Sequence, residues 1–130
     1  MTATDEDVVR GLLLDVRSGE RPERAGSYLA PLVTAHQGRP GAVHDVVVRS
    51  PDEYADHVRE MLRDLGPWTF ELRTLQSAGG LVDATWRQTG VVGPAEGRTV
   101  VEHGQAAYRV VDGRVSEYWI EFRHETEEPS

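Results

Sequence analysis

The hydrophobic spacing of the chain changes at Trp68, and this change limits the fold more than any other feature of the sequence. Before Trp68 the apolar residues recur every three or four positions, as on one face of a helix, whereas afterwards they alternate with polar residues, as on a strand. Alternating runs occupy 68–75, 81–90, 98–111 and 114–125, with glycine-containing turns between them. Helices first and an antiparallel meander afterwards predict an α+β fold, with the helices on one face of a curved sheet.

Three helices are expected in the first half of the chain. The first runs over 4–18, from a threonine N-cap through an acidic first turn, and the second is a shorter helix over 22–29 that a proline ends. An extended segment over 32–37 and a Gly/Pro-rich loop over 37–45 follow. The third helix is expected over 50–65, because a capping box with proline at the first helical position opens it and Gly-Pro closes it.

Composition places the chain among ordinary globular proteins. Its 130 residues are expected to form one domain over 1–130, with frayed ends at 1–4 and 125–130. A net charge of -8 disfavours nucleic acid as a partner. No apolar run approaches the roughly 18 residues that a membrane span needs, so we expect a cytoplasmic protein without a membrane partner. The absence of cysteine and lysine excludes a thiolate nucleophile and a Schiff-base lysine.

The stretch YRVVDGRVSEYWIEFRHE at 108–125 carries the most informative polar pattern. Its Asp-Gly pair at 112–113 is typical of a two-residue type I′ turn, which pairs Val111 with Arg114. Continued without interruption, this register places every second residue of the return strand on one face. The side chains that share this face are Glu117, Trp119, Glu121 and Arg123.

Small residues on the neighbouring strand favour a pocket over that face. The same register sets Ala106 opposite Trp119 and Gly104 opposite Glu121, which leaves room above the larger side chains. A slip of the hairpin by one residue would exchange the two faces. An alternating strand with carboxylates on one side is also typical of a half-solvated surface, so both interpretations stand at this point. The opposite face would carry Tyr118, Ile120 and Phe122.

The residues also resemble a known family. The pieces YLAPLVTAH, ATWRQTG and EGRTVVEHGQAAYRVVDGRVSEYW, together with the order of helices and strands, are similar to the SnoaL-like polyketide cyclases of the NTF2-like superfamily. The resemblance implies an NTF2-like cone whose Trp119 face looks inward, and a homodimer that pairs through the outer sheet face. It further implies an intramolecular aldol closure that needs no cofactor, in which a carboxylate acts as general acid with help from a histidine.

The resemblance suggests roles for particular residues. Glu121 is the expected acid or base, Arg123 its electrostatic partner and His36 the helper. Glu102, Arg123 and Glu121 also form an acid-base-acid set loosely similar to the one in epoxide hydrolases of this fold. The side chains expected to contact the ligand are Trp86, Tyr108, Trp119, Glu117, Tyr28 and Trp68. We expect no metal, because no pair of histidines has a ligand spacing such as H-E-x-x-H.

Three functions are compatible with this pattern. The leading hypothesis is a cofactor-independent cyclase or isomerase that acts on a hydrophobic, polyketide-like or polycyclic carbonyl compound. The alternatives are an enzyme that adds water to an epoxide and a binding or assembly module without catalysis. Catalysis requires an enclosed Glu121, whereas a binding module needs only the apolar wall.

Overall fold

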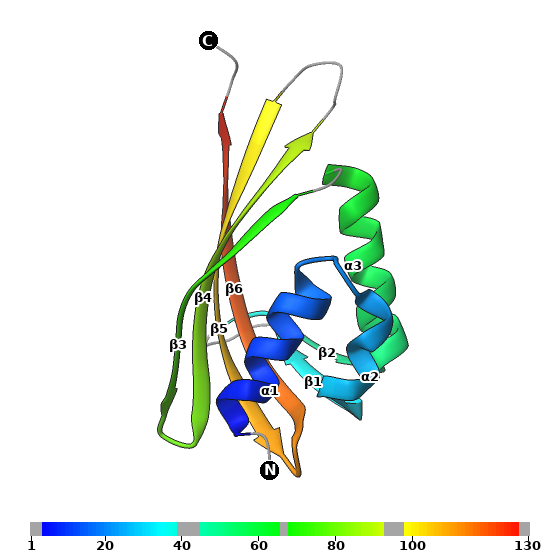
Figure 1. Cartoon of the computed structure of the whole chain (residues 1–130), viewed down its shortest axis with the longest axis vertical. Coiled ribbons are helices and arrows are strands. Elements are labelled where there is room, and N and C mark those ends of the chain that lie inside the picture. The colour runs from blue at the N-terminus through cyan, green and yellow to red at the C-terminus, as the bar shows by residue number, and fades with distance from the viewer. Residues whose placement is uncertain (1–3, 39–44, 66–67, 93–97, 128–130) are drawn as a thin grey trace.

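The sheet and its helices form two layers. The computed structural model describes residues 4–38, 45–65, 68–92 and 98–127. Six strands form one sheet in the order β2-β1-β6-β5-β4-β3, in which β1 and β6 pair parallel and all other neighbours pair antiparallel. The helices lie together on one side of this curved sheet (Figure 1). The predicted α+β architecture is confirmed.

The first helix begins as predicted but changes its pitch. Helix α1 spans Asp5–Gly11, and Thr4 caps it in a capping box with Asp7. The chain continues as a π-helix over Leu12–Arg17, in which each bond closes one residue later than in an α-helix. This wider turn leaves two pairs of neighbouring residues buried on the side that faces the sheet. They are Leu12, Leu13, Val16 and Arg17.

The second helix is shorter than predicted. A 3₁₀ turn over Pro22–Arg24 leads into α2, Ala25–Tyr28, and strand β1, Leu29–His36, begins at once. The prediction that Pro31 ends a helix is wrong, because Pro31 lies within β1 where the ladder to β6 is irregular and its missing N–H is tolerated. Strand β2, Val46–Arg49, was not predicted, since its three exposed valines show no alternation.

The long helix and the meander agree with the prediction. Helix α3 spans Pro51–Leu65, and the capping box joins Ser50 and Glu53. No helix in the described part of the chain is long and apolar enough to cross a membrane. Of the two ends expected to fray, 1–4 and 125–130, Thr4 caps α1 and 125–127 belong to β6. Residues 1–3 and 128–130 lie outside the described residues. The strands of the meander are β3, Thr69–Ala78, β4, Leu81–Val92, β5, Arg98–Val111, and β6, Arg114–Glu127.

The turn between β5 and β6 is the predicted one, but the register beyond it is not. Both turn residues at 112–113 have positive φ, as a type I′ turn requires, and Val111 pairs with Arg114. Two residues further along, Arg109 pairs with Glu117, so Ser116 is an extra residue on β6 and forms a β-bulge.

The bulge exchanges the two faces of β6 from Glu117 onward. Tyr108 now lies opposite Tyr118, not opposite Glu117 as predicted. With this register Tyr108 and Tyr118 are almost fully buried, whereas Arg123 is exposed. A straight ladder that kept Tyr108 inside would place Glu117, Glu121 and Arg123 against the helices and expose Tyr118, so burial favours the shifted register. The outer face of β5 and β6 therefore carries His103, Gln105, Ala107, Glu117, Trp119, Glu121 and Arg123.

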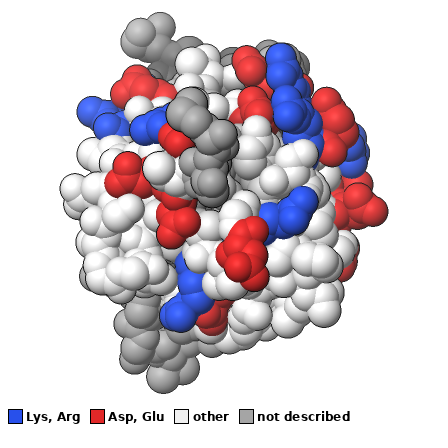
Figure 2. All heavy atoms as spheres, turned by 60° about the horizontal axis from the view of Figure 1, so that its bottom comes forward, with Lys and Arg blue, Asp and Glu red and all other residues white. Residues whose placement is uncertain are grey.

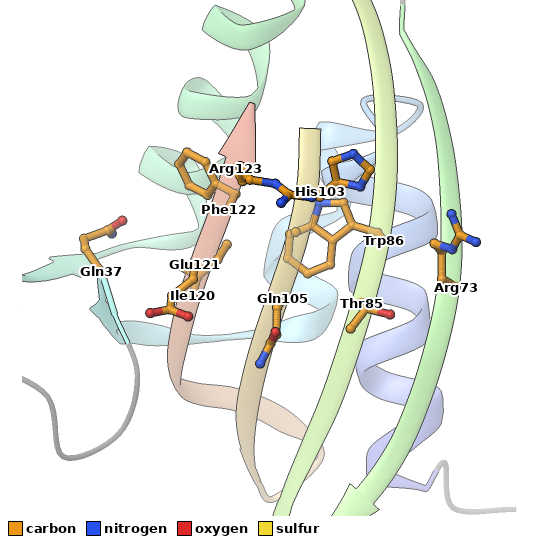
Figure 3. Close-up of a pocket in the computed structure, with 11 residues that line it drawn as sticks. Gln37, Arg73, Thr85, Trp86, His103, Gln105, Ile120, Glu121, Phe122 and Arg123 are labelled. Carbon is orange, nitrogen blue, oxygen red and sulfur yellow. The ribbon is translucent and has the colours of Figure 1, made fainter. Parts of the chain in front are cut away.

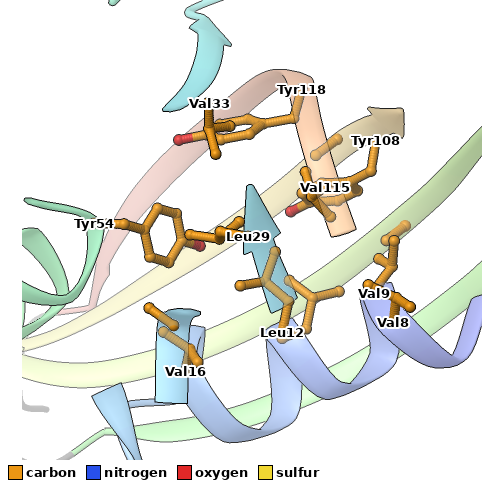
Figure 4. Close-up of a cluster of buried hydrophobic side chains, with 14 of the residues drawn as sticks. Val8, Val9, Leu12, Val16, Leu29, Val33, Tyr54, Tyr108, Val115 and Tyr118 are labelled. Atoms are coloured by element: carbon orange, nitrogen blue, oxygen red, sulfur yellow. The ribbon is translucent and has the colours of Figure 1, made fainter. Parts of the chain in front are cut away.

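The core lies between the helices and the inner face of the sheet (Figure 4). The π-helical turn contributes Leu12, α3 contributes Val58 and β1 contributes Val33, each at most 1% exposed. Tyrosine and tryptophan side chains from the sheet and from α3 complete this layer. Because such aromatic side chains also bring polar atoms into the interior, the core is not purely apolar.

The surface charges are mixed. Acidic and basic side chains lie interspersed on the face that Figure 2 shows. Exposed pairs such as Arg59 with Asp56, whose Nη1 and Oδ1 atoms are 3.0 Å apart, add little to stability because water screens them. They differ in this respect from the one pair of charged side chains that the described residues bury.

Candidate functional site

The buried ion pair joins the first helix to the centre of the sheet. Arg17, the last residue of the π-helical turn, donates from Nη2 to Oε2 of Glu102 on β5 at 2.8 Å. Their side chains are only 5% and 4% exposed, and the two residues lie 85 positions apart in the chain. A buried pair of this kind is tolerated only when further hydrogen bonds compensate for the lost water.

Further donors converge on the same carboxylate oxygen. Trp86 Nε1 donates to Glu102 Oε2 at 3.0 Å. The amide of Gln88 satisfies its surroundings when its nitrogen donates to Oε2 at 3.1 Å and its oxygen faces Trp68 Nε1 at 2.7 Å. Trp68 Nε1 also lies 2.5 Å from the backbone oxygen of Ser18. The network therefore connects β4, β5 and Trp68, which directly precedes β3, to the end of the first helix.

Gly104 makes room for this network. It pairs with Trp86 across β4 and β5, and a Cβ atom on Gly104 would lie 2.0 Å from Cε2 of the indole. The space over Gly104, which the sequence assigned to a ligand, is therefore filled by Trp86. The prediction that Gly104 faces Glu121 is wrong, since Gly104 pairs with Phe122.

Three phenols, those of Tyr54, Tyr108 and Tyr118, lie together in the core (Figure 4), and each interacts electrostatically with Arg17. The ring centroids of Tyr54 and Tyr118 are 6.3 Å apart, and those of Tyr108 and Tyr118 are 5.7 Å apart. Burial raises the pKa of all three hydroxyl groups. The phenols therefore stay protonated near neutral pH and can act as hydrogen-bond donors.

The electrostatics keep Arg17 charged in this interior. Burial lowers the pKa of Arg17, but Glu102, with smaller contributions from Tyr54 and Tyr108, outweighs it and the pKa is raised overall. Half-buried His57 on α3 has a lowered pKa, because of burial first and then the nearby Arg49 and Arg17. Among the described residues no three His, Asp or Glu side chains gather to hold a metal ion.

Some of the predicted site residues lie in this interior. Trp86, Tyr108 and Glu102 are buried on the inner face of the sheet, and Trp68 borders them through Gln88. Tyr28 does not join them, because it packs over Gly11 and donates a short hydrogen bond to Asp15.

The other predicted residues lie on the outer face, so the expectation that they look into the cone is wrong. His36 stacks on Trp119 with ring centroids 4.8 Å apart, and its Nε2 lies 2.6 Å from Oε2 of Glu117. Glu121 and Arg123 border a hollow of about 880 Å³ on this face (Figure 3). The sheet therefore separates Glu102 from Glu121 and Arg123, and the predicted acid-base-acid set does not assemble.

Sequence reasoning missed Arg17, although a signal for it exists. Arg17 continues the helical spacing of Val9 and Leu13, so a charged residue falls on an apolar stripe. A charge in that position is costly unless it finds a partner inside the molecule. Tyr54 and Gln88 were not among the predicted site residues either.

The curved sheet encloses this interior together with the helices that pack on its inner face. Such an arrangement is an α+β cone of the NTF2-like class. Comparison with protein families matches residues 11–118 to the SnoaL-like domain. The chain therefore belongs to the SnoaL-like family, and the resemblance seen in the sequence is confirmed. A comparison with curated proteins gives no match.

Solved structures support the same fold. IdmH from Streptomyces antibioticus, described provisionally as a polyketide cyclase, superposes with a TM-score of 0.71 at 20% identity over 92% of each chain. An NTF2-like protein from Burkholderia thailandensis gives 0.68 at 23% identity over 95% of this chain and 92% of that one. An LEH-like epoxide hydrolase from M. tuberculosis gives 0.66 at 17% identity, covering 92% and 82%. At these identities the likeness concerns the fold alone.

Proposed function

We propose that the chain is a cofactor-independent cyclase or isomerase that moves a proton next to a carbonyl group of a polyketide-like or polycyclic compound. The observation that carries this proposal is a carboxylate, Glu102, enclosed beside the cation Arg17 and close to protonated phenols. Proton abstraction next to a carbonyl needs a base shielded from water and donors that stabilise the developing oxyanion. The interior cluster offers both.

The reaction follows from this arrangement. Glu102 takes the proton from the carbon next to the carbonyl, and the electron pair of that C–H bond forms the C=C bond of an enolate. In an isomerase the proton returns to another carbon, whereas in a cyclase the enolate carbon attacks a second carbonyl of the same molecule. That carbonyl oxygen then accepts a proton, so no oxidant or cofactor is consumed.

Glu102 takes the acid/base role that the sequence assigned to Glu121. Glu102 is 3% exposed at the centre of the buried network, whereas Glu121 borders the open hollow of the outer face. The alternative of adding water to an epoxide loses its proposed residue set, because the sheet separates Glu102 from Glu121 and Arg123. A binding module without catalysis remains distinguishable by experiment.

We expect the protein to exchange the acidic protons of an enolisable bicyclic ketone, 2-tetralone, for deuterium in D₂O, followed by proton NMR. Glu102→Gln should lower the exchange rate by about 100-fold or more, because the general base is lost. Glu121→Gln is the matched control and should leave the rate unchanged. Mass spectrometry of metabolite extracts incubated with the same proteins would then identify the natural substrate.

Other outcomes of this experiment have definite meanings. Loss of exchange in Glu121→Gln with full activity in Glu102→Gln would place the chemistry on the outer face. A ketone that binds to the protein without any deuterium exchange would contradict the proposed enzymatic activity and favour a binding module without catalysis. Circular dichroism of each variant separates a chemical effect from unfolding.

We also propose that two copies pair through the outer sheet face. Ladder positions Arg87, His103 and Arg123 form a basic row across three strands, and two rows away Asp83 lies on the same face as Trp119. A two-fold axis between these rows would bring the basic row of one copy, with its two arginines, against Asp83 and Trp119 of the other. Such an arrangement is self-complementary, as an interface between identical subunits must be.

Charge reversal tests this pairing. In analytical ultracentrifugation we expect a dimer for the wild type and at least tenfold weaker association, about 1.4 kcal/mol, for Arg123→Glu. Arg63→Glu on the exposed side of α3 is the matched control and should leave the dimer intact. A dimer that survives Arg123→Glu but dissociates on Val47→Lys would place the interface at the exposed edge strand β2 instead.

A further inference from the structure

Arg17 uses little of its capacity for hydrogen bonding. Its guanidinium carries five N–H donors, of which Nη2 meets Glu102 and Nη1 meets only the sulfur of Met61, at 3.2 Å. Sulfur is a weak acceptor, and Arg17 Nε has no partner. Among the described residues Nε of Arg17 is the one buried side-chain nitrogen or oxygen without a hydrogen bond. Leaving such a donor unsatisfied is costly, so a group that accepts a hydrogen bond from Nε would bind favourably there.

The surroundings of Arg17 hold it in this arrangement. The guanidinium carbon of Arg17 lies 5.7 Å from the centroid of the Trp86 ring. The backbone of Arg17 belongs to the π-helical turn. A carboxylate and a guanidinium can form two parallel hydrogen bonds, yet Arg17 contacts Glu102 through Nη2 alone, at an oxygen that also accepts from Trp86. The two side chains therefore do not form the bidentate pair that their geometry allows. π-Helical turns occur frequently at functional sites, which agrees with a role for this residue.

We propose that Nε of Arg17 receives the carbonyl oxygen of the substrate and holds the enolate oxygen that forms when Glu102 removes the neighbouring proton. This inference rests on the proposed function and assigns the substrate class: a ketone or β-dicarbonyl compound whose carbonyl oxygen lies on Arg17 while its acidic C–H faces Glu102. The electron pair of the C–H bond becomes the C=C bond, the carbonyl π pair moves onto oxygen, and the proton ends on Glu102.

The charge balance of this step favours Arg17 over the phenols as the holder of the oxyanion. Among the described residues, the buried charges before the transfer are one cation, Arg17, and one anion, Glu102. Afterwards Glu102 is neutral and the enolate oxygen carries the negative charge, so Arg17 keeps one counter-ion throughout. A charge-assisted hydrogen bond is about twice as strong as one from a neutral phenol. No separated charge therefore has to exist in the low-dielectric interior at any stage.

The probe for this site is 2-naphthol, whose anion has the shape of the enolate of 2-tetralone. Glu102→Gln mimics the protonated carboxyl group, so it should bind 2-naphtholate about tenfold or more tightly than the wild type, measured by calorimetry. Adding Arg17→Lys should remove this gain, because lysine keeps the charge but not the Nε donor. Naphthalene, which lacks the oxygen, should bind all variants alike, and Arg10→Lys on the surface of α1 is the matched control.

A second measurement follows the wild-type protein by NMR. In the wild-type protein the Nε–H proton of Arg17 should give a slowly exchanging NMR signal, assigned by its loss in Arg17→Lys or by its contacts to Trp86. On addition of 2-naphthol this signal should move downfield, as expected for a new hydrogen bond to an oxyanion.

Two results would overturn the inference. One is an Arg17 Nε signal that does not move although 2-naphthol binds, and the other is naphtholate affinity that survives Arg17→Lys but is lost in Tyr108→Phe. In either case deuterium exchange that still depends on Glu102 would leave the proposed function standing. Conversely, 2-naphtholate that binds through Arg17 in a protein without deuterium exchange would support the oxyanion site and contradict the proposed enzymatic activity.

Discussion

Replacing Glu102 by Leu is expected to lower the free energy of unfolding by about 3–5 kcal/mol. The substitution leaves Arg17 inside the molecule without its counter-charge, at a position where its side chain is 5% exposed. It also removes the acceptor of Trp86 and Gln88, whose N–H groups then remain unsatisfied. Urea unfolding followed by tryptophan fluorescence measures the change directly, because Trp86 belongs to the network.

The double variant Arg17→Met/Glu102→Leu tests the cause. With both charges removed, most of the lost stability should return, since buried ion pairs are often no more stable than apolar residues of similar volume. Glu121→Leu on the outer face is the matched control and should change stability by less than about 0.5 kcal/mol. Equal losses for Glu102→Leu and Glu121→Leu would contradict a buried pair, as would a double variant as unstable as the sum of the single changes.

Features of the fold that depend on neighbouring residues could be predicted from the sequence. The cap at Thr4, the capping box at Ser50 and the type I′ turn at 112–113 each follow from a few adjacent residues, and the structure confirms them. The boundary at Pro31 could not be predicted in this way. Its tolerance in β1 depends on the irregular ladder with a strand more than 80 positions later.

The faces of β6 could not be predicted because two requirements conflict there. The turn fixes Val111 opposite Arg114, whereas burial requires Tyr118 to face inward, and only an extra residue at Ser116 satisfies both. Glu121 and Arg123 were misplaced by this one residue, while Trp86 on the uninterrupted strand β4 lies buried on the inner face of the sheet.

Arg17 illustrates a different limit. The charged residue on the apolar stripe of the first helix shows that some interior partner exists, but the sequence does not say which one. Glu102 becomes that partner through the packing of the helix on the sheet. Contacts across such distances in the chain follow from tertiary structure, which local patterns do not encode.

Gly104→Ala is expected to destabilise the protein by about 1–3 kcal/mol, although alanine normally suits a strand better than glycine. The new Cβ would lie 2.0 Å from Cε2 and 2.3 Å from Nε1 of Trp86, closer than any atoms can pack. The indole is 1% exposed and rigid, so it must shift as a whole. Its 3.0 Å hydrogen bond to Glu102 would then be lost, and deuterium exchange of 2-tetralone should fall together with stability.

Two comparisons make this test specific. Gly26→Ala in α2 adds the same methyl group where nothing lies within 4 Å, so it should be neutral or stabilising by up to about 1 kcal/mol. In a Trp86→Leu background the indole is absent, and Gly104→Ala should then cost much less than in the wild type. An equal cost in both backgrounds would mean that the methyl group is rejected by the backbone of the sheet. Trp86 would in that case hold Glu102 without depending on the space that Gly104 leaves.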